Sequence, residues 1–146
     1  YGQMKKAVLS FAIATNAELL LLDEPSNGLD IPSKTLFRRI IVQHVSDNTC
    51  TLISTHQVRD LENLIDPIII LDNKAVLINA SLEKISEKLY FGLYSSVPAN
   101  ALFSEPAPGG YICVMENEEM GESKVNIEAL FNATMHHKSR IKELLV

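Results

Sequence analysis

The pattern of hydrophobic and polar positions divides the first 89 residues into alternating helical and extended segments. Stretches in which apolar residues recur every three or four positions predict amphipathic helices, and short continuous apolar runs predict buried strands. Helices are predicted over 4–15, 36–45, 57–65 and 82–89, and strands over 18–23, 50–55, 67–71 and 75–80. Such alternation is typical of an α/β fold with a parallel sheet.

One predicted strand leads directly into two acidic residues. Four leucines at 19–22 are followed by Asp23, Glu24 and Pro25, and a turn-forming run occupies 26–30. A short apolar run bounded by turn residues predicts a strand covered on both faces, as in parallel sheets, whose carboxyl ends carry ligand sites. Because successive strand side chains point to opposite faces, we expect the two carboxylates to diverge, one toward a metal and the other toward a water.

The organisation changes from residue 90 onward. Strands are predicted at 90–94 and 111–116, separated by a loop that is rich in proline and glycine. The glutamates within 116–122 predict a solvated acidic loop rather than a metal site, and the histidines and basic residues of 136–142 predict an exposed helical tail. We therefore expect an appended lobe after residue 89.

Composition and charge limit the classes of function. The chain has 146 residues, enough for one domain, and its 47% hydrophobic and 21% charged residues are close to ordinary globular usage. The net charge of −5 argues against a nucleic-acid partner, which would need a basic face. The apolar stretch 7–22 is interrupted by Asn16 and Glu18 and is shorter than the roughly 20 residues of a membrane span. The isolated Cys50 and Cys113 predict neither a zinc site nor a disulfide framework.

Four motifs, in order, resemble the ATP-binding subunits of ABC transporters over roughly residues 1–89. Tyr1, Gly2 and Gln3 are similar to the tail of the family's Leu-Ser-Gly-Gly-Gln signature, with Tyr1 at the position of its first glycine. Residues 22–25 resemble the end of the Walker B strand with its catalytic glutamate, 26–30 resemble the D-loop, and 54–56 resemble the switch-histidine loop. Residues 127–131 resemble the Leu-Glu-x-x-Phe helix that ends many exporter-type subunits.

The resemblance implies a fold and a division into domains. The fold class would be α/β, the C-terminal part of a P-loop NTPase core of the ABC ATPase kind, with a parallel sheet and flanking helices. A small α+β C-terminal lobe would follow. Residues 1–89 would form the ATPase part and residues 90–146 the lobe.

The resemblance also implies ATP hydrolysis, with ATP and Mg²⁺ as cofactors. Asp23 would help to hold Mg²⁺ through its water shell, because Mg²⁺ sheds water reluctantly. Glu24 would act as the general base on the attacking water, and His56 would contact the γ-phosphate and that water. The protein would mainly position groups and stabilise charge, as in other phosphoryl transfers to water.

Two partners are implied, a transmembrane permease subunit and a second ATP-binding subunit in a head-to-tail dimer. Gly2 and Gln3 of the signature would close over the ATP of the opposing subunit, and Asp30 would lie at the dimer seam. Hydrolysis would open the dimer and move the permease. The implied location is cytoplasmic, peripheral on the inner face of the cell membrane.

One element of the family is missing, since no Gly-x-x-x-x-Gly-Lys-Ser/Thr run occurs in this sequence. The chain also begins with Tyr1 rather than Met, so we expect the C-terminal portion of a longer subunit, inactive alone. In the family, the strand before the missing loop lies between the strands that match 51–55 and 67–71. Because that strand is absent here, the sheet would have an open edge. We expect this edge to be covered in one of four ways: by direct pairing of 51–55 with 67–71 within the chain, by a second copy of the chain, by exchange of the 90–116 strands, or by the missing half of the subunit. Self-association of the fragment is therefore predicted.

Each candidate residue also has a structural interpretation. Asp23 and Glu24 could accept hydrogen bonds from loop N–H groups, Asp30 could cap the helix that follows it, and His56 could be a satisfied histidine at a strand end. Other functions also stay open. The motifs are compatible with an ABC-type ATPase of DNA repair or translation, and with a non-catalytic interaction module that retains them by descent.

Overall fold

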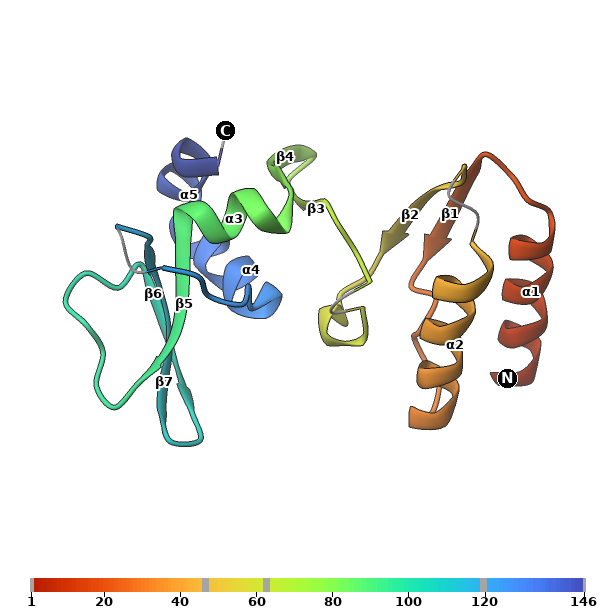
Figure 1. Cartoon of the computed structure of the whole chain (residues 1–146), viewed down its shortest axis with the longest axis horizontal. Helices are drawn as coiled ribbons and strands as arrows, with labels where there is room; N and C mark the ends of the chain where they lie inside the picture. The colour runs from red at the N-terminus through yellow and green to blue at the C-terminus, as the bar shows by residue number, and fades with distance from the viewer. Residues whose placement is uncertain (1, 46–47, 62–63, 119–120, 146) are drawn as a thin grey trace. The chain divides into compact units, whose positions relative to one another are not determined.

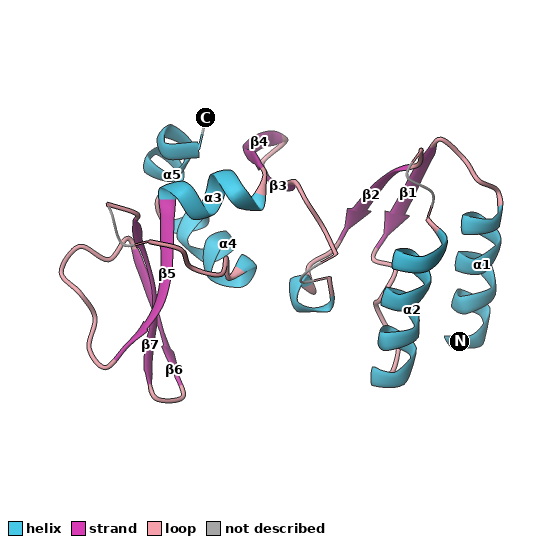
Figure 2. Ribbon diagram, viewed as in Figure 1, coloured by secondary structure: helices cyan, strands magenta, loops and turns pink. Residues whose placement is uncertain are grey.

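The chain divides into two compact units, residues 1–64 and 65–146 (Figure 1). The computed structural model describes residues 2–45, 48–61, 64–118 and 121–145. In chain order, the elements are α1 (Gly2–Ala14), β1 (Leu19–Asp23), α2 (Ile31–His44), β2 (Cys50–Ser54), the 3-10 turn η1 (Val58–Asp60), β3 (Ile68–Asp72), β4 (Ala75–Ala80), α3 (Leu82–Lys88), β5 (Leu89–Tyr94), β6 (Phe103–Ala107), β7 (Gly110–Glu116), α4 (Ile127–His136) and α5 (Lys138–Leu145) (Figure 2). The predicted division between residues 89 and 90 rests on where the family resemblance ends, and it stays a prediction.

The first unit contains a parallel pair of strands with two helices beside it. β1 pairs with β2 in parallel, with Leu21 opposite Leu52. Leu20 is buried and lines a small cavity together with Ile13 of α1 and Val45, which follows α2. A mixed α/β arrangement is therefore present, as the sequence predicts, and α1 and α2 lie on the Leu20 side of the strand pair.

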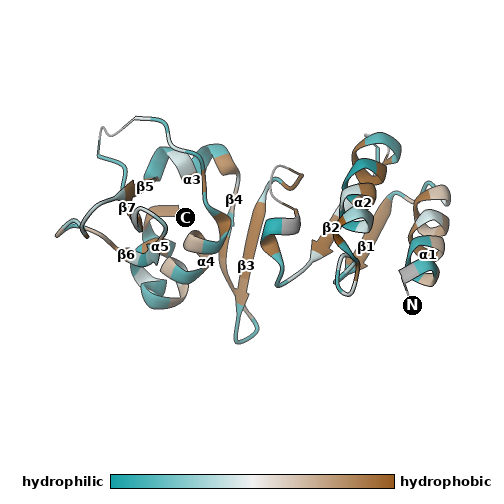
Figure 3. Cartoon of the chain, turned by 90° about the horizontal axis from the view of Figure 1, so that it is seen from below, coloured by the Kyte–Doolittle hydropathy of each residue, from teal (hydrophilic) through white to brown (hydrophobic). Residues whose placement is uncertain are grey.

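The other face of the strand pair is open in the part of the chain that the structure describes. The side chains of Leu19, Leu21 and Leu52 are 55%, 63% and 52% exposed. Figure 3 shows the hydrophobic character of β1 and β2. The prediction that the leucine strand is covered on both faces is therefore wrong for the described residues. Side chains alternate along a strand, and both helices lie on one side of it.

The helix predicted over 4–15 is confirmed as α1, but most of its apolar stripe points outward. Met4, Val8 and Phe11 are all exposed, whereas Ile13 is buried. These three exposed residues recur at helical spacing and so lie on one face of α1. The first unit therefore presents a second apolar surface besides the open face of β1 and β2.

The helix predicted over 36–45 is confirmed as α2, which begins earlier, at Ile31. Pro32 lies in the first turn, where its missing N–H costs nothing, and Phe37 and Ile41 are buried. The helix predicted over 57–65 is replaced by the short η1 in the described residues, and positions 62 and 63 lie outside them.

The second unit begins with a hairpin. β3 and β4 pair antiparallel, and they are joined by Asn73 and Lys74, whose φ angles are 46° and 65°. Positive φ at both central residues is the geometry of a two-residue type I′ turn, which asparagine tolerates well. Ser81 then accepts a hydrogen bond from the backbone N of Lys84 and caps α3, as predicted.

A three-stranded antiparallel sheet follows, in the order β5, β7, β6. β5 and β7 match the strands predicted at 90–94 and 111–116, but β6 lies within a segment predicted as loop. Pro106 is part of β6 and cannot donate a backbone hydrogen bond. It is tolerated because β6 is an edge strand, with β7 as its neighbour on one side.

The tail predicted over 136–142 is helical, and its other face is packed. α4 contacts β6 and β7, and α5 contacts α4, α3 and β4. His136, His137, Arg140 and Lys142 are exposed, as predicted, whereas Ile141 and Leu145 of α5 are buried. In the predicted acidic loop, Glu116 accepts a hydrogen bond from the Arg140 side chain at 2.7 Å, and Glu119 lies outside the described residues.

Candidate functional site

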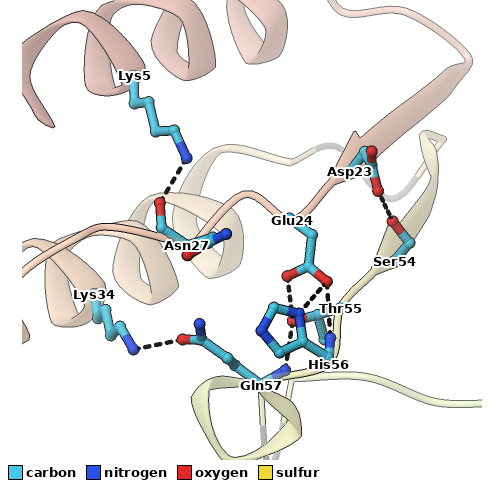
Figure 4. A network of polar contacts seen from close by, with 9 residues as sticks. All are labelled: Lys5, Asp23, Glu24, Asn27, Lys34, Ser54, Thr55, His56 and Gln57. Carbon is cyan, nitrogen blue, oxygen red and sulfur yellow. Dashed lines mark hydrogen bonds and ion pairs between the residues drawn. The ribbon is translucent and has the colours of Figure 1, made fainter. Parts of the chain in front are cut away.

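The candidate site lies at the carboxyl ends of β1 and β2 (Figure 4). The two strands end side by side, with Asp23 opposite Ser54. The Ser54 hydroxyl donates a hydrogen bond to the Asp23 carboxylate, and the backbone N of Glu24 donates to the Ser54 carbonyl at 2.9 Å. The parallel pairing therefore brings residues that are about thirty positions apart in sequence to one edge.

Glu24 turns away from the strand and is held by the segment after β2. Its φ of 44° lies in the left-handed region, which is uncommon for a residue with a long side chain. Its Oε1 lies 2.9 Å from the backbone N of His56 and 2.6 Å from His56 Nδ1. The Thr55 hydroxyl donates to Oε2 at 3.1 Å. Figure 4 shows Asp23 and Glu24 directed at different partners.

The contact with His56 bears on the charge of Glu24 and on which ring nitrogen of His56 is the donor. An ionised carboxylate only accepts hydrogen bonds, so Nδ1 of His56 carries the proton in this contact. The hydrogen bond from the His56 side chain is the main reason that the pKa of Glu24 lies below its ordinary value, and the backbone N of His56 and the Thr55 hydroxyl add to it. Glu24 is therefore an anion at neutral pH, which is the state that can accept a proton.

Asp30 lies at the other end of the loop, before α2. Its carboxylate accepts a hydrogen bond from the backbone N of Ser33 at 2.9 Å and caps the helix. The hydrogen bonds from Ser33 also hold the pKa of Asp30 below its ordinary value. The structural interpretation of Asp30 as a helix cap is thus correct, and its role at a dimer seam stays a prediction.

The remaining predicted site residues lie at the start of α1. Gly2 is its first residue, Gln3 is exposed, and Tyr1 lies outside the described residues. Lys5, one turn further, donates a hydrogen bond from Nζ to the carbonyl of Asn27 and so connects α1 to the loop after β1. The structure therefore brings Glu24 and His56 into contact, next to Asp23, and places Gly2, Gln3 and Asp30 at two helix starts.

Sequence reasoning missed the polar residues that surround Glu24. The motif at 54–56 contains Ser54 and Thr55 without a role for either hydroxyl, yet each hydroxyl donates to a site carboxylate. Gln57 lies outside the motifs, although its backbone N donates to Thr55 Oγ1 at 2.9 Å and its Oε1 accepts from Lys34 Nζ at 2.9 Å. The available signal was the run of polar residues directly after a predicted strand.

The residues fit part of an Mg²⁺ and ATP site. In proteins, Mg²⁺ is held by one or two carboxylates together with waters and phosphates, so the exposed Asp23 carboxylate suits a contact through water. Within the described ranges, no group of three or more His, Cys, Asp or Glu side chains could hold a metal by itself. The glycine-rich run that would cradle phosphates does not occur in the sequence.

Many known proteins are similar to this chain, among them ATP-binding proteins of ABC transporters, while no family model matches the chain. The ABC transporter ATP-binding protein NatA of Bacillus subtilis is 30% identical over 86 residues, which are 59% of this chain and 35% of NatA. The probable ABC transporter ATP-binding protein p29 of Mycoplasma pneumoniae is 30% identical over 94 residues, 64% of this chain and 38% of p29. The manganese transport system ATP-binding protein MntA of Synechocystis sp. is 29% identical over 106 residues, 70% of this chain and 40% of MntA.

Each match covers only part of this chain and less than half the length of the relative. Among the described residues, none of the helices combines the length and the apolar character that a membrane crossing needs.

Proposed function

Because this chain is homologous to the ATP-binding proteins of ABC transporters, we propose that it contributes the water-activating part of an ATP hydrolysis site. The single observation that carries the proposal is the contact between Glu24 and His56 at the ends of two parallel strands. An anionic carboxylate, held by a histidine and next to a second carboxylate, suits the activation of a water for phosphoryl transfer.

The proposed roles follow the geometry of the strand ends. Glu24 accepts the proton of the attacking water, and His56 holds Glu24 through Nδ1–H. Asp23, whose carboxylate accepts a hydrogen bond from Ser54, would help to hold Mg²⁺ through a water. Bound MgATP supplies the phosphoanhydride bond that is broken. Catalysis here is mostly positioning, because phosphoryl transfer asks little covalent chemistry of the protein.

The proposed assembly needs two further subunits. Gly2, Gln3 and Asp30 would contact a second ATP-binding subunit in a head-to-tail dimer, and a transmembrane permease would take up the resulting motion. This assembly would place the protein at the inner face of the cell membrane, where the permease selects the transported substrate.

The open apolar face of β1 and β2 supports a further proposal, that the chain by itself associates with copies of itself.

A second candidate function rests on one observation, the missing phosphate-binding run. Its glycines and lysine make most of the contacts to phosphates in P-loop proteins. If no other part of the assembled protein supplies such a phosphate-binding run, the chain would serve as a non-catalytic interaction module.

Replacement of Glu24 by glutamine in the assembled transporter tests the proposal. Glu24→Gln keeps the shape and removes the proton acceptor, so turnover should fall by about 10² to 10⁴ while ATP binding persists. The matched control is Glu18→Gln, an exposed glutamate before β1, which should leave turnover within about threefold of wild type. If Glu24→Gln also stays within about threefold, another residue is the base. A transporter that binds no ATP at the site containing Glu24 would favour the interaction module.

A further inference from the structure

We propose that Thr55 is a positioning residue that selects Oε2 of Glu24 as the proton-accepting oxygen and aims it. The inference rests on the proposed function, in which Glu24 is the general base. The observation behind it is the distribution of hydrogen bonds over the two carboxylate oxygens. Oε1 takes two contacts, from the backbone N and from Nδ1 of His56, and Oε2 takes one, from the Thr55 hydroxyl.

The distribution leaves room for a water proton on one oxygen only. A carboxylate has roughly four lone-pair positions, two on each oxygen. Both positions on Oε1 are used by His56, at 2.9 Å and 2.6 Å. One position on Oε2 is used by Thr55 at 3.1 Å, so its second position is the remaining acceptor of Glu24 among the hydrogen bonds described. The oxygen that Thr55 holds is therefore the oxygen that accepts the proton.

The Thr55 hydroxyl is itself held in one orientation. The backbone N of Gln57 donates to Thr55 Oγ1 at 2.9 Å, which uses a lone pair of the hydroxyl and directs its single proton elsewhere. That proton is donated to Glu24 Oε2. Gln57 is connected in turn to α2, because Lys34 Nζ donates to its Oε1 at 2.9 Å. The carboxylate is thus tied to α2 as well as to the end of β2 (Figure 4).

The expected consequence of losing the hydroxyl is a misaimed carboxylate rather than a lost nucleotide contact. Thr55→Val keeps the branched shape of the side chain and removes two hydrogen bonds, the one to Glu24 Oε2 and the one from the backbone N of Gln57. His56 would still hold Oε1, so Glu24 would remain nearby but rotate about that anchor. Small misplacements of catalytic groups reduce rates strongly, so kcat should fall by about tenfold or more while KM for ATP stays the same.

The first test needs no catalysis. Three-bond NMR couplings that report χ1 of Glu24 are measured in this chain for wild type, Thr55→Val and Thr55→Ser. One fixed rotamer is expected in wild type and in Thr55→Ser, which keeps the hydroxyl, and averaged couplings are expected in Thr55→Val. A fixed Glu24 rotamer in Thr55→Val, or an averaged one in wild type, overturns the inference.

The second test separates positioning from folding, with Thr51→Val as the matched control. Thr51 lies in β2, which ends just before Thr55, and its buried Oγ1 has no hydrogen-bond partner in the described structure, so the same chemical change there removes no hydrogen bond. In the assembled transporter, Thr55→Val should lower kcat by about tenfold or more, with Thr55→Ser and Thr51→Val within about threefold of wild type.

The outcomes distinguish this inference from the proposed function. A Thr55→Val variant with kcat within about threefold of wild type refutes the positioning role, even when Glu24→Gln is inactive. A merely structural role would appear as a Thr55→Val variant that melts well below Thr51→Val, with kcat lowered and KM for ATP changed as well. That result would also refute the positioning role. An active Glu24→Gln refutes the general base itself, and the couplings still decide whether Thr55 holds Glu24.

Discussion

At the scale of single residues, Asp30 has a measurable role in the fold. Its carboxylate accepts a hydrogen bond from the backbone N of Ser33 and closes the first turn of α2. The pKa of Asp30 is lowered chiefly by a hydrogen bond from the Ser33 side chain and next by the one from the Ser33 backbone N, so the charged form is the one that stabilises the helix. A lowered folded pKa means that the stabilisation is present at neutral pH and is lost as the pH falls through the folded pKa.

We predict a pH-dependent effect of replacing this cap. Asp30→Ala should melt a few degrees below wild type at pH 7, because the first-turn N–H loses its partner. The gap should shrink as the pH falls below the ordinary aspartate pKa of about 3.9, because the carboxyl of the unfolded chain then takes up a proton, and the charge contribution is gone below the lower folded pKa, where the native carboxyl is protonated too. Asp30→Asn keeps a capping oxygen without a charge, and its gap to Asp30→Ala should not change with pH. Thermal melts followed by circular dichroism at several pH values measure both gaps, and a constant gap between wild type and Asp30→Ala would contradict the prediction.

The contact between Glu24 and His56 can be predicted from the sequence, whereas the hydrogen bonds on each Glu24 oxygen cannot. The motifs place Glu24 and His56 near each other because both follow strands of one parallel sheet, and the structure brings them into contact. The motifs do not give the number of hydrogen bonds on each carboxylate oxygen. That number depends on the left-handed backbone of Glu24 and on the side-chain orientation of Thr55, which a linear pattern does not encode.

At the scale of elements, α5 stabilises the second unit although its sequence reads as a charged tail. Only two of its apolar positions, Ile141 and Leu145, are buried, and Lys142 and Glu143 occupy the exposed positions between them. Composition alone therefore suggests exposure, whereas the spacing of the two apolar residues, four apart, places both on one face. β6 was missed for a related reason, because Pro106 indicates a loop unless the strand lies at an edge.

Truncation of the buried face of α5 tests its contribution. Ile141→Ala should lower the free energy of unfolding of the second unit by about 2–5 kcal/mol, because it removes a fully buried side chain and leaves a cavity. Lys142→Ala, on the exposed side of the same helix, should change it by less than about 0.5 kcal/mol. Three of the four tyrosines, Tyr90, Tyr94 and Tyr111, lie in this unit and the chain has no tryptophan, so urea unfolding followed by tyrosine fluorescence reports mainly on it. Equal effects of the two variants would show that α5 is not part of this unit's cooperative core.

At the scale of the whole molecule, the two units differ in how their sheets are protected. In the second unit, Pro106 blunts one edge of the three-stranded sheet, and α4 contacts two of its strands. In the first unit, β1 and β2 form a two-stranded sheet, and one face of that pair exposes Leu19, Leu21 and Leu52. Parallel sheets are normally covered on both faces, so this surface favours association.

We therefore predict concentration-dependent association of the chain through the first unit. Light scattering across a dilution series should show the average mass rising with concentration in wild type. Leu21→Lys places a charge on the open face and should lower that rise. Leu93→Lys, at a similarly exposed leucine of the second unit, should leave it unchanged. A strictly monomeric wild type at high concentration would rule the association out.

The left-handed backbone of Glu24 has a consequence for how this loop evolves. A φ of 44° costs a residue with a side chain about 1–2 kcal/mol, and glycine avoids that cost. Natural selection for a stable fold alone would favour glycine or asparagine at this position. If the carboxylate has the proposed role, we expect selection for activity to keep a glutamate here despite the backbone cost. Variants recovered from screens for thermal stability are thus expected to lose this residue early, and with it the chemistry proposed for the loop.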